Sequence, residues 1–230
     1  AHLVLVSKYY VFANQNLLID ICLHLGSLIA IIVYFRNDLF DFIKNKSFLT
    51  KILIGTVPII PVGYITYQTE LINQLRNLEV IGWMSLIFGI LLYVSDKSKI
   101  TKKIDTEFTN KSAIFIGLFQ VLAFIPGASR AGVTITGSRL LGFSRESAAI
   151  YSMLLSIPII LASLIFSIFD IKNNPLHEVN IEQSFFAALI ACFTALLSIH
   201  FMMKLIQKTN FNLFIIYRII LGFILLFFYA

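Results

Sequence analysis

Apolar residues run along the chain in six long stretches that are separated by short polar segments. The stretches cover residues 17–35, 48–67, 80–95, 148–169, 184–204 and 211–229. A helix needs about 20 mostly apolar residues to cross a bilayer, so each stretch predicts a membrane-spanning helix. The pattern therefore predicts an all-α polytopic membrane protein.

Two shorter apolar pieces, 112–125 and 132–143, flank a Gly- and Pro-containing segment at 124–134. Neither piece is long enough to cross a bilayer comfortably. Irregular backbone at membrane depth is tolerated where it is buried in protein or lines a wet cavity. We therefore expect a re-entrant helix–loop–helix that enters the membrane and returns to the same side.

The charges between the apolar stretches give an orientation, because cytoplasmic loops are enriched in Lys and Arg. Segments 36–51 and 96–111 are basic, and Lys204 and Lys208 flank the last turn, which predicts that these parts face the cytoplasm. Segments 68–79 and 170–183 carry more acidic than basic residues and are predicted to lie outside. The sides alternate only if the 112–143 hairpin is re-entrant, and the basic residues at its exit, Arg139 and Arg145, agree.

The two halves of the chain have opposite predicted orientations. Residues 17–30 would run from outside to inside and residues 148–161 from inside to outside, each followed by two more spans. This order predicts an inverted repeat within a single membrane domain, 1–230, with an incomplete first repeat at 1–95 and a second at 112–230. The first repeat should contain a re-entrant hairpin as well. We expect residues 1–12 to be the tail of that hairpin and the rest of it to precede Ala1.

Composition supports the membrane interpretation and limits the alternatives. The chain is 58% hydrophobic and 13% charged, whereas a soluble domain is nearer ~45–50% apolar and ~25% charged. The net charge of +6 lies in short loops and is not gathered on a soluble face, which excludes a nucleic-acid binder. Cys22 and Cys192 lie in apolar stretches and predict small buried hydrophobes, with no disulfide framework or metal cluster.

The segment 124–134 carries the chemistry that stands out. Pro126 and Gly127 are predicted to end the incoming helix, and Gly132 to relax the backbone where the next helix begins. NH groups near Ser129 and Arg130 would then lie at a helix N-terminus, which binds anions. An Arg at membrane depth costs about 2.5–3.5 kcal/mol on insertion scales, so it needs an anionic partner. The segment predicts a phosphate pocket.

Several segments resemble undecaprenyl-pyrophosphate phosphatase of the bacitracin-resistance type. They are PGASRAG at 126–132 with the preceding GLFQVLAFI, TITGSRLLGFSRESAA from Thr134, LIDICLHLGSLIAII from Leu18, FIIYRIILGF from Phe214, and the initial Ala-His-Leu. The resemblance covers essentially the whole chain. It implies a phosphatase of the bacterial inner membrane that converts undecaprenyl diphosphate to the monophosphate for cell-wall synthesis. It also implies two re-entrant helix pairs, an active site on the periplasmic side, and a homodimer.

The resemblance also assigns residues. His2, Ser129 and Arg130 would be catalytic, and Gly127, Ala128, Ser129, Arg130 and Thr134 would bind the polyprenyl diphosphate lipid. His2 would transfer a proton or attack phosphorus.

The chain departs from the family pattern in two ways. A divalent cation, Mg²⁺ or Ca²⁺, is implied, but the family's two Glu spaced four apart would precede Ala1, so this chain offers no metal ligands. We therefore expect the 230 residues by themselves to show little or no activity. Ala131 replaces a second Ser of the family's loop.

Other interpretations remain open at this stage. Arg130 could cap carbonyls or pair with Asp20, Ser129 could be only an N-cap, and Thr134 could bond back within its helix. Arg218 in the last apolar stretch could snorkel or be paired. At the level of function, the alternatives are a transporter or flippase of an anionic lipid or solute, and a remnant that keeps the fold without activity.

Overall fold

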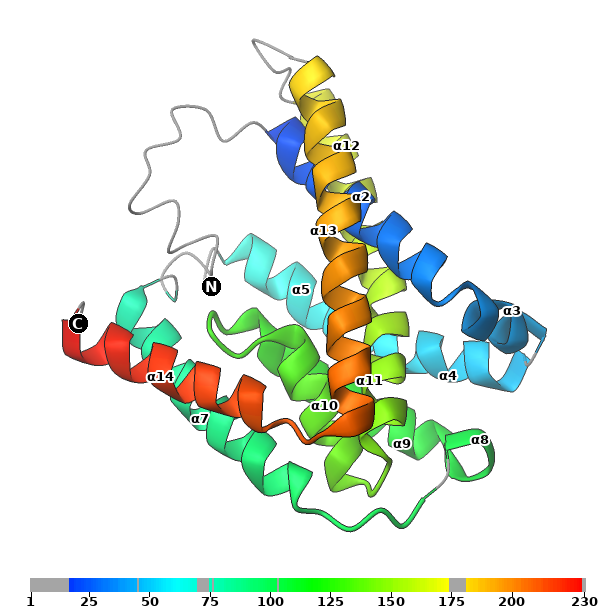
Figure 1. Ribbon diagram of the computed structural model, residues 1–230. Helices are drawn as coiled ribbons and strands as arrows, with labels where there is room; N and C mark the ends of the chain where they lie inside the picture. The colour runs from blue at the N-terminus through cyan, green and yellow to red at the C-terminus, as the bar shows by residue number, and fades with distance from the viewer. Residues whose placement is uncertain are drawn as a thin grey trace. The chain divides into compact units, whose positions relative to one another are not determined.

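A computed structural model describes residues 17–44, 46–69, 75, 77–102, 104–173 and 181–228 (Figure 1). These residues form helices joined by turns and loops, and no strand occurs among them. The prediction of an all-α protein is confirmed. His2 and the rest of 1–16 lie outside the described residues.

Four helical stretches in the described part are long and apolar enough to cross a membrane. They are Lys46–Thr66, Leu78–Asp96, Arg145–Ser167 and Glu182–Lys208. The first and last predicted spans form shorter apolar helices, Ile21–Tyr34 and Asn212–Phe227. A polytopic membrane protein is thereby confirmed, while the sides on which its loops lie stay a prediction.

Proline divides two of the predicted spans. The 48–67 stretch forms α4 (Lys46–Thr56) and α5 (Ile59–Gln68), with Pro58 at the break. The 148–169 stretch forms α11 (Arg145–Leu154) and α12 (Ser156–Asn173), and Pro158 lies in the first turn of α12. Because proline has no NH to donate to the carbonyl four residues earlier, the helix ladder is interrupted before each of them.

The described residues form two compact units. One contains those within Thr50–Ser152 and Leu205–Ala230, and the other those within Phe12–Leu49 and Met153–Lys204. Each unit takes segments from both halves of the sequence. The division does not test the predicted inverted repeat, which stays a prediction.

The second unit contains α2 (Leu17–Tyr34), α3 (Arg36–Lys44), α12 and α13 (Ile181–Lys208) up to Lys204. Helix α2 packs along α12. It also meets α13 closely at Gly26, where a Cβ would lie 2.3 Å from the carbonyl oxygen of Ala188. Such close approach of small residues is typical of helix packing in membranes. Cys22 and Cys192 are half-buried free thiols.

In the first unit, α7 (Leu78–Asp96) and α14 (Asn212–Phe228) run side by side (Figure 1). Gly82 and Gly222 face each other, because a Cβ on Gly222 would lie 2.9 Å from the carbonyl oxygen of Gly82. Further along the same pair of helices, a Cβ on Gly89 would lie 3.4 Å from Cβ of Arg218. The small residues therefore let the two backbones approach closely and place Arg218 against α7.

The predicted hairpin is present in the same unit. It consists of α9 (Asn110–Val121), the 3-10 turn η1 (Leu122–Phe124), a loop, and α10 (Arg130–Leu140), with α10 packed on both α9 and α7. Thr109 caps α9 by accepting a hydrogen bond from the NH of Ser112. The helix–loop–helix prediction is confirmed, and its insertion into a membrane stays a prediction.

The segment 96–111 is more ordered than a simple basic loop, since it contains the short helix α8 (Ile104–Glu107). Phe108, just after α8, packs edge-on against Phe143 and Tyr151, with ring centroids 5.4 and 4.6 Å apart. The hydroxyl of Tyr151 donates to the carbonyl oxygen of Lys51 at 3.1 Å. These contacts tie α8, α11 and α4 together at one end of the unit.

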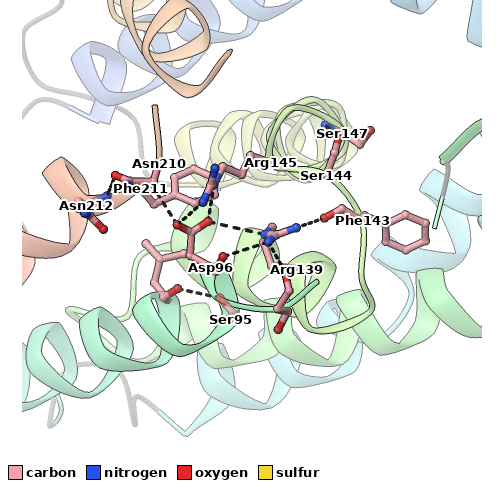
Figure 2. Close-up of polar contacts among 12 residues, drawn as sticks. Ser95, Asp96, Arg139, Phe143, Ser144, Arg145, Ser147, Asn210, Phe211 and Asn212 are labelled. Atoms are coloured by element: carbon pink, nitrogen blue, oxygen red, sulfur yellow. Dashed lines mark hydrogen bonds and ion pairs between the residues drawn. The ribbon is translucent and has the colours of Figure 1, made fainter. Parts of the chain in front are cut away.

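Asp96, at the end of α7, is contacted by residues at the end of α10 and at the starts of α11 and α14 (Figure 2). Arg145 donates to both carboxylate oxygens of Asp96, at 2.6 and 2.9 Å. The Nη2 atom of Arg139 donates to the carbonyl oxygens of Asp96 and Ser98, and its Nη1 to that of Phe143. From the sequence, Arg139 and Arg145 are predicted to be loop charges at the exit of the hairpin. In the structure Arg139 is 2% exposed, and both arginines contact Asp96. The NH of Phe211, just before α14, makes a longer contact of 3.5 Å with Oδ2 of Asp96. This Asp96 cluster therefore joins the end of α10 and the starts of α11 and α14 to the end of α7.

Candidate anion site at the start of helix α10

The loop between η1 and α10 owes its shape to Pro126 and Gly127. Ile125, which precedes the proline, is extended with φ −74° and ψ 120°, as steric contact with a following proline favours. Gly127 then adopts φ +95°, and a Cβ there would lie 2.6 Å from the carbonyl oxygen of Ile81 in α7. Only glycine combines this dihedral angle with such a close approach.

Ser129 is the N-cap of α10 and has an unusual backbone. Its φ is 64° and its ψ is 114°, and its hydroxyl oxygen accepts a hydrogen bond from the NH of Gly132 at 3.3 Å. A non-glycine residue in this region is strained, and such strain is commonly found at functional sites. The structure corrects one detail of the sequence analysis, since Gly127 and Ser129 change the chain direction while Gly132 lies inside α10.

Ala128, between Gly127 and Ser129, attaches the loop to the apolar core. Ala128 is fully buried and packs with Phe88 of α7 and Val133 of α10. Leu122 and Ile125 cover the same cluster. The loop is therefore held on α7 by apolar contact on one side, while the side chain of Ser129 is exposed on the other.

Arg130 is the first residue of α10, as predicted, and its guanidinium carries a donor without an acceptor. Its Nη1 atom is buried and has no hydrogen-bond partner among the described residues. A buried, unpaired cation is costly, because the protein gives nothing in return for the lost hydration. Its position at the first residue of α10 places it with the free NH groups of that helix end, where an anion is favoured.

Arg218 of α14 contacts the same loop. Its Nη2 atom donates to the carbonyl oxygen of Gly127 at 2.9 Å and makes a longer contact of 3.5 Å with that of Met84. Arg218 is 8% exposed, and its buried Nε has no partner in the described part of the chain. Of the two alternatives for Arg218, these contacts fit a paired arginine, with backbone carbonyls as its partners, and its burial does not fit snorkelling.

Thr134 lies one turn into α10 and is fully buried. Its hydroxyl contacts the carbonyl oxygen of Arg130 at 2.9 Å and the hydroxyl of Ser152 at 2.6 Å. This is the geometry of a hydroxyl that bonds back within its own helix. Direct contact of Thr134 with a substrate stays a prediction, and Ser152 is a partner that the sequence did not suggest.

The described loop suits an anion and does not suit a cation. It offers main-chain NH groups, one hydroxyl and arginine side chains, and it contains no carboxylate. Among the described residues, no group of three His, Cys, Asp or Glu side chains could hold a metal ion. We therefore derive no step through a metal from this loop.

Comparison with known proteins decides the family. Residues 1–224 match the family model described as bacitracin resistance protein BacA. The chain belongs to this family. The match covers the loop at 126–132, His2 and Arg218, and it confirms the resemblance found in the sequence.

Proteins of this family with similar sequences carry one name. The chain is similar to the undecaprenyl-diphosphatase of Pelagibacter ubique (strain HTCC1062), with 44% identity over 234 residues, 98% of this chain and 88% of that protein. It is also similar to the undecaprenyl-diphosphatase of Dinoroseobacter shibae, with 39% identity over 239 residues, 98% of this chain and 89% of that protein. For that of Hahella chejuensis, the identity is 35% over 235 residues, 96% and 87% of the two chains.

Proposed function

We propose that this member of the bacitracin resistance family hydrolyses undecaprenyl diphosphate to undecaprenyl phosphate. Three similar proteins are named for that activity. The observation in this chain that carries the proposal is Arg130, whose buried Nη1 has no partner at the start of a helix. A phosphate group is the kind of ligand that meets such a guanidinium and helix end together.

The reaction consumes one water molecule. The oxygen of water, or of a side chain that water later replaces, forms a bond to the terminal phosphorus, and the bond from that phosphorus to the bridging oxygen breaks. The bridging oxygen stays with the lipid as part of the monophosphate, and the terminal phosphoryl group leaves as inorganic phosphate. Negative charge grows on the bridging oxygen as this bond breaks, so a fixed cation beside it lowers the barrier.

Each residue of the loop has a role in this proposal. Arg130 neutralises the diphosphate charge, and the main-chain NH groups at the start of α10 and the exposed hydroxyl of Ser129 bind phosphate oxygens. Gly127 and Ala128 give the loop its shape. His2, outside the described residues, is proposed to transfer the proton or to attack phosphorus.

The setting of the reaction is part of the proposal. A polyprenyl chain is apolar and suits the lipid-facing surface of helices such as α7 and α14, on which Trp83, Ile90 and Ile216 are more than half exposed. We place the protein in the bacterial inner membrane as a multi-pass protein, with the active site toward the periplasm and with a homodimer as its assembly. A divalent cation, as the family resemblance implies, would need ligands from outside the described residues.

The test measures inorganic phosphate released from undecaprenyl diphosphate in detergent micelles. It uses the protein translated from its natural start codon, and Arg130→Gln as the variant. Release by the wild type and its loss in Arg130→Gln are expected. Movement of the lipid between vesicle leaflets without phosphate release would overturn the proposal in favour of a transporter. The same assay on residues 1–230 by themselves tests the expectation of little or no activity.

A further inference from the structure

We propose that Arg218 is a second diphosphate-binding residue and that it lets the site distinguish the diphosphate substrate from the monophosphate product. The inference rests on the proposed function, because it assigns Arg218 to the site that Arg130 defines. It goes further in naming a residue from the other end of the chain and in giving that residue a part in specificity.

The position of the Arg218 guanidinium is set by the first turn of α10. A Cβ on Gly132 would lie 2.6 Å from Nη1 of Arg218 and 3.5 Å from Oγ of Ser129. The guanidinium therefore occupies the space beside Gly132, next to the hydroxyl that caps the helix. With Nη2 on the carbonyl oxygen of Gly127 at 2.9 Å, Arg218 touches both ends of the 127–132 segment.

The hydrogen bonds of Arg218 do not neutralise its positive charge. Its acceptors in the described residues are the neutral carbonyls of Gly127 and Met84, and its buried Nε has none. Within the described part of the first unit, no ion pair of Arg130 or Arg218 with a carboxylate occurs. Arg130 is the first residue of α10 and Arg218 contacts the first turn of the same helix, so an anion of more than one charge would neutralise both cations.

The charge of the ligand then separates substrate from product. A diphosphate has two phosphoryl groups on which two guanidinium groups can act, whereas a monophosphate has one. With Arg130 on one phosphoryl group and Arg218 on the other, loss of the terminal phosphate removes the partner of one arginine. The site thus favours the diphosphate and weakens its hold on the product.

Gly132 has a specific part in this arrangement. Because any side chain there would meet the guanidinium of Arg218, glycine is needed to admit it. An alanine would suit the helix itself, since alanine is the better helix former. The variant Gly132→Ala is therefore expected to displace the guanidinium of Arg218 and impair binding of the diphosphate, while the better helix propensity of alanine offsets the lost contact with Gly127.

A purely structural role for Arg218 makes a different prediction. If Arg218 only positioned the loop through the carbonyl of Gly127, its loss would lower the affinity of the loop for pyrophosphate and for phosphate by the same factor. If Arg218 binds the second phosphoryl group, its loss weakens pyrophosphate and spares phosphate. The ratio of the pyrophosphate affinity to the phosphate affinity therefore distinguishes the two roles, because a purely structural role leaves this ratio unchanged.

The experiment measures binding of inorganic pyrophosphate and of inorganic phosphate, without added metal, by the rise in unfolding temperature of the detergent-solubilised chain. For Arg218→Gln we expect the pyrophosphate affinity to fall by about tenfold or more, as for the loss of a charge-assisted hydrogen bond, and the phosphate affinity by less than about threefold. Lys111→Gln removes the same charge from an exposed position at the far end of α9 and should change neither affinity.

Two further variants keep the test decisive if Arg218→Gln does not fold. Arg218→Lys retains the charge with a single ammonium and should recover part of the affinity ratio, and Gly132→Ala should lower the ratio with Arg218 still present. An unchanged ratio in the folded variants overturns the inference. Phosphate release by the wild type together with that result would leave the proposed function standing, and a changed ratio without any phosphate release would overturn the function instead.

Discussion

Arg218 and Gly127 are 91 positions apart in the sequence, yet Nη2 of Arg218 donates a hydrogen bond of 2.9 Å to the carbonyl oxygen of Gly127. The last helix of the chain therefore holds the loop that precedes α10. Helix α7 completes the arrangement, since Ile81 contacts Gly127 and Phe88 packs on Ala128. The site is built where three helices from distant parts of the sequence meet.

Arg130 gives the first prediction, because it should serve binding and not stability. Its Nη1 has no partner to lose among the described residues, so Arg130→Gln should leave the unfolding temperature unchanged or raise it. Phosphate release should fall by about 10²–10³-fold, the loss seen when one fixed charge-stabilising donor is removed. Thermal unfolding and a phosphate assay check the two parts.

Lys111→Gln is the matched control for Arg130, since it removes one positive charge from an exposed position of the same unit. It should change neither quantity. A large fall in the unfolding temperature of Arg130→Gln would mean that Arg130 supports the fold and that its interpretation as a ligand-binding residue is wrong.

The backbone of Ser129 gives the second prediction. Ser129→Ala loses the hydrogen bond to the NH of Gly132 and keeps the strained φ of 64°, and losing such a cap costs about 1 kcal/mol. Ser129→Gly loses the same bond but relieves the strain. The glycine variant should therefore unfold at a higher temperature than the alanine variant. The reverse order would show that the conformation of Ser129 is not strained.

Thr134 and Ser152 give the third prediction, which separates support of α10 from contact with the substrate. Their hydroxyls are 2.6 Å apart and buried. Thr134→Val should cost about 1–3 kcal/mol of stability, because Ser152 is left without this partner. Thr134→Ser should retain stability and phosphate release, since it keeps the hydroxyl.

The double variant Thr134→Val with Ser152→Ala completes this test. If the pair only supports α10, removing both hydroxyls should restore stability and phosphate release toward the wild type. Restored stability with phosphate release still lost would instead assign Thr134 a direct contact with the diphosphate.

Asp96 gives the fourth prediction. Its carboxylate accepts two hydrogen bonds from Arg145 and lies 3.7 Å from Nε of Arg139, and Asp96 is 7% exposed. Asp96→Asn leaves two partly buried cations without their anion, and removing one partner of a buried ion pair costs about 3–5 kcal/mol. Unfolding in detergent should show a loss of that size.

Glu146→Gln is the comparison for Asp96, because Glu146 is exposed and accepts a hydrogen bond from Gln207 at 2.7 Å. Its effect on the free energy of unfolding should be below about 1 kcal/mol, as for exposed polar pairs. Equal effects of the two variants would show that the Asp96 cluster does not stabilise the ends of these helices.

The apolar pattern was sufficient to predict the long apolar helices of the described part, because membrane spans are long and their composition is extreme, but α3 and α8 lie in segments that it treats as basic loops. The loop at 126–132 was also predictable as a helix N-terminus, since proline, glycine and serine each restrict the backbone in a known way. Arg130 followed from the same argument, because a charge beside apolar stretches needs a partner.

The partners across helices were not predictable in this way. Periodicity indicates that Arg218 lies in an apolar helix, but it does not say which loop its guanidinium reaches. The sequence placed Asp96, Arg139 and Arg145 among loop charges because it carries no signal that the three contact one another. The sequence predicts that Gly132 relaxes the backbone, but it gives no sign that a Cβ on Gly132 would lie 2.6 Å from Nη1 of Arg218.

The contact between Gly82 and Gly222 has a consequence for how this protein can vary. A Cβ on Gly222 would lie 2.6 Å from Cγ of Leu86 and 2.9 Å from the carbonyl oxygen of Gly82, so α7 and α14 are too close there to admit a larger residue without a shift. A methyl group added at either position would act as a wedge, and the displacement would be carried along α14 to the guanidinium of Arg218. Substitutions on the opposite, outward-facing side of these helices leave this contact unchanged, whereas a larger residue at Gly82 or Gly222 would alter the position of Arg218.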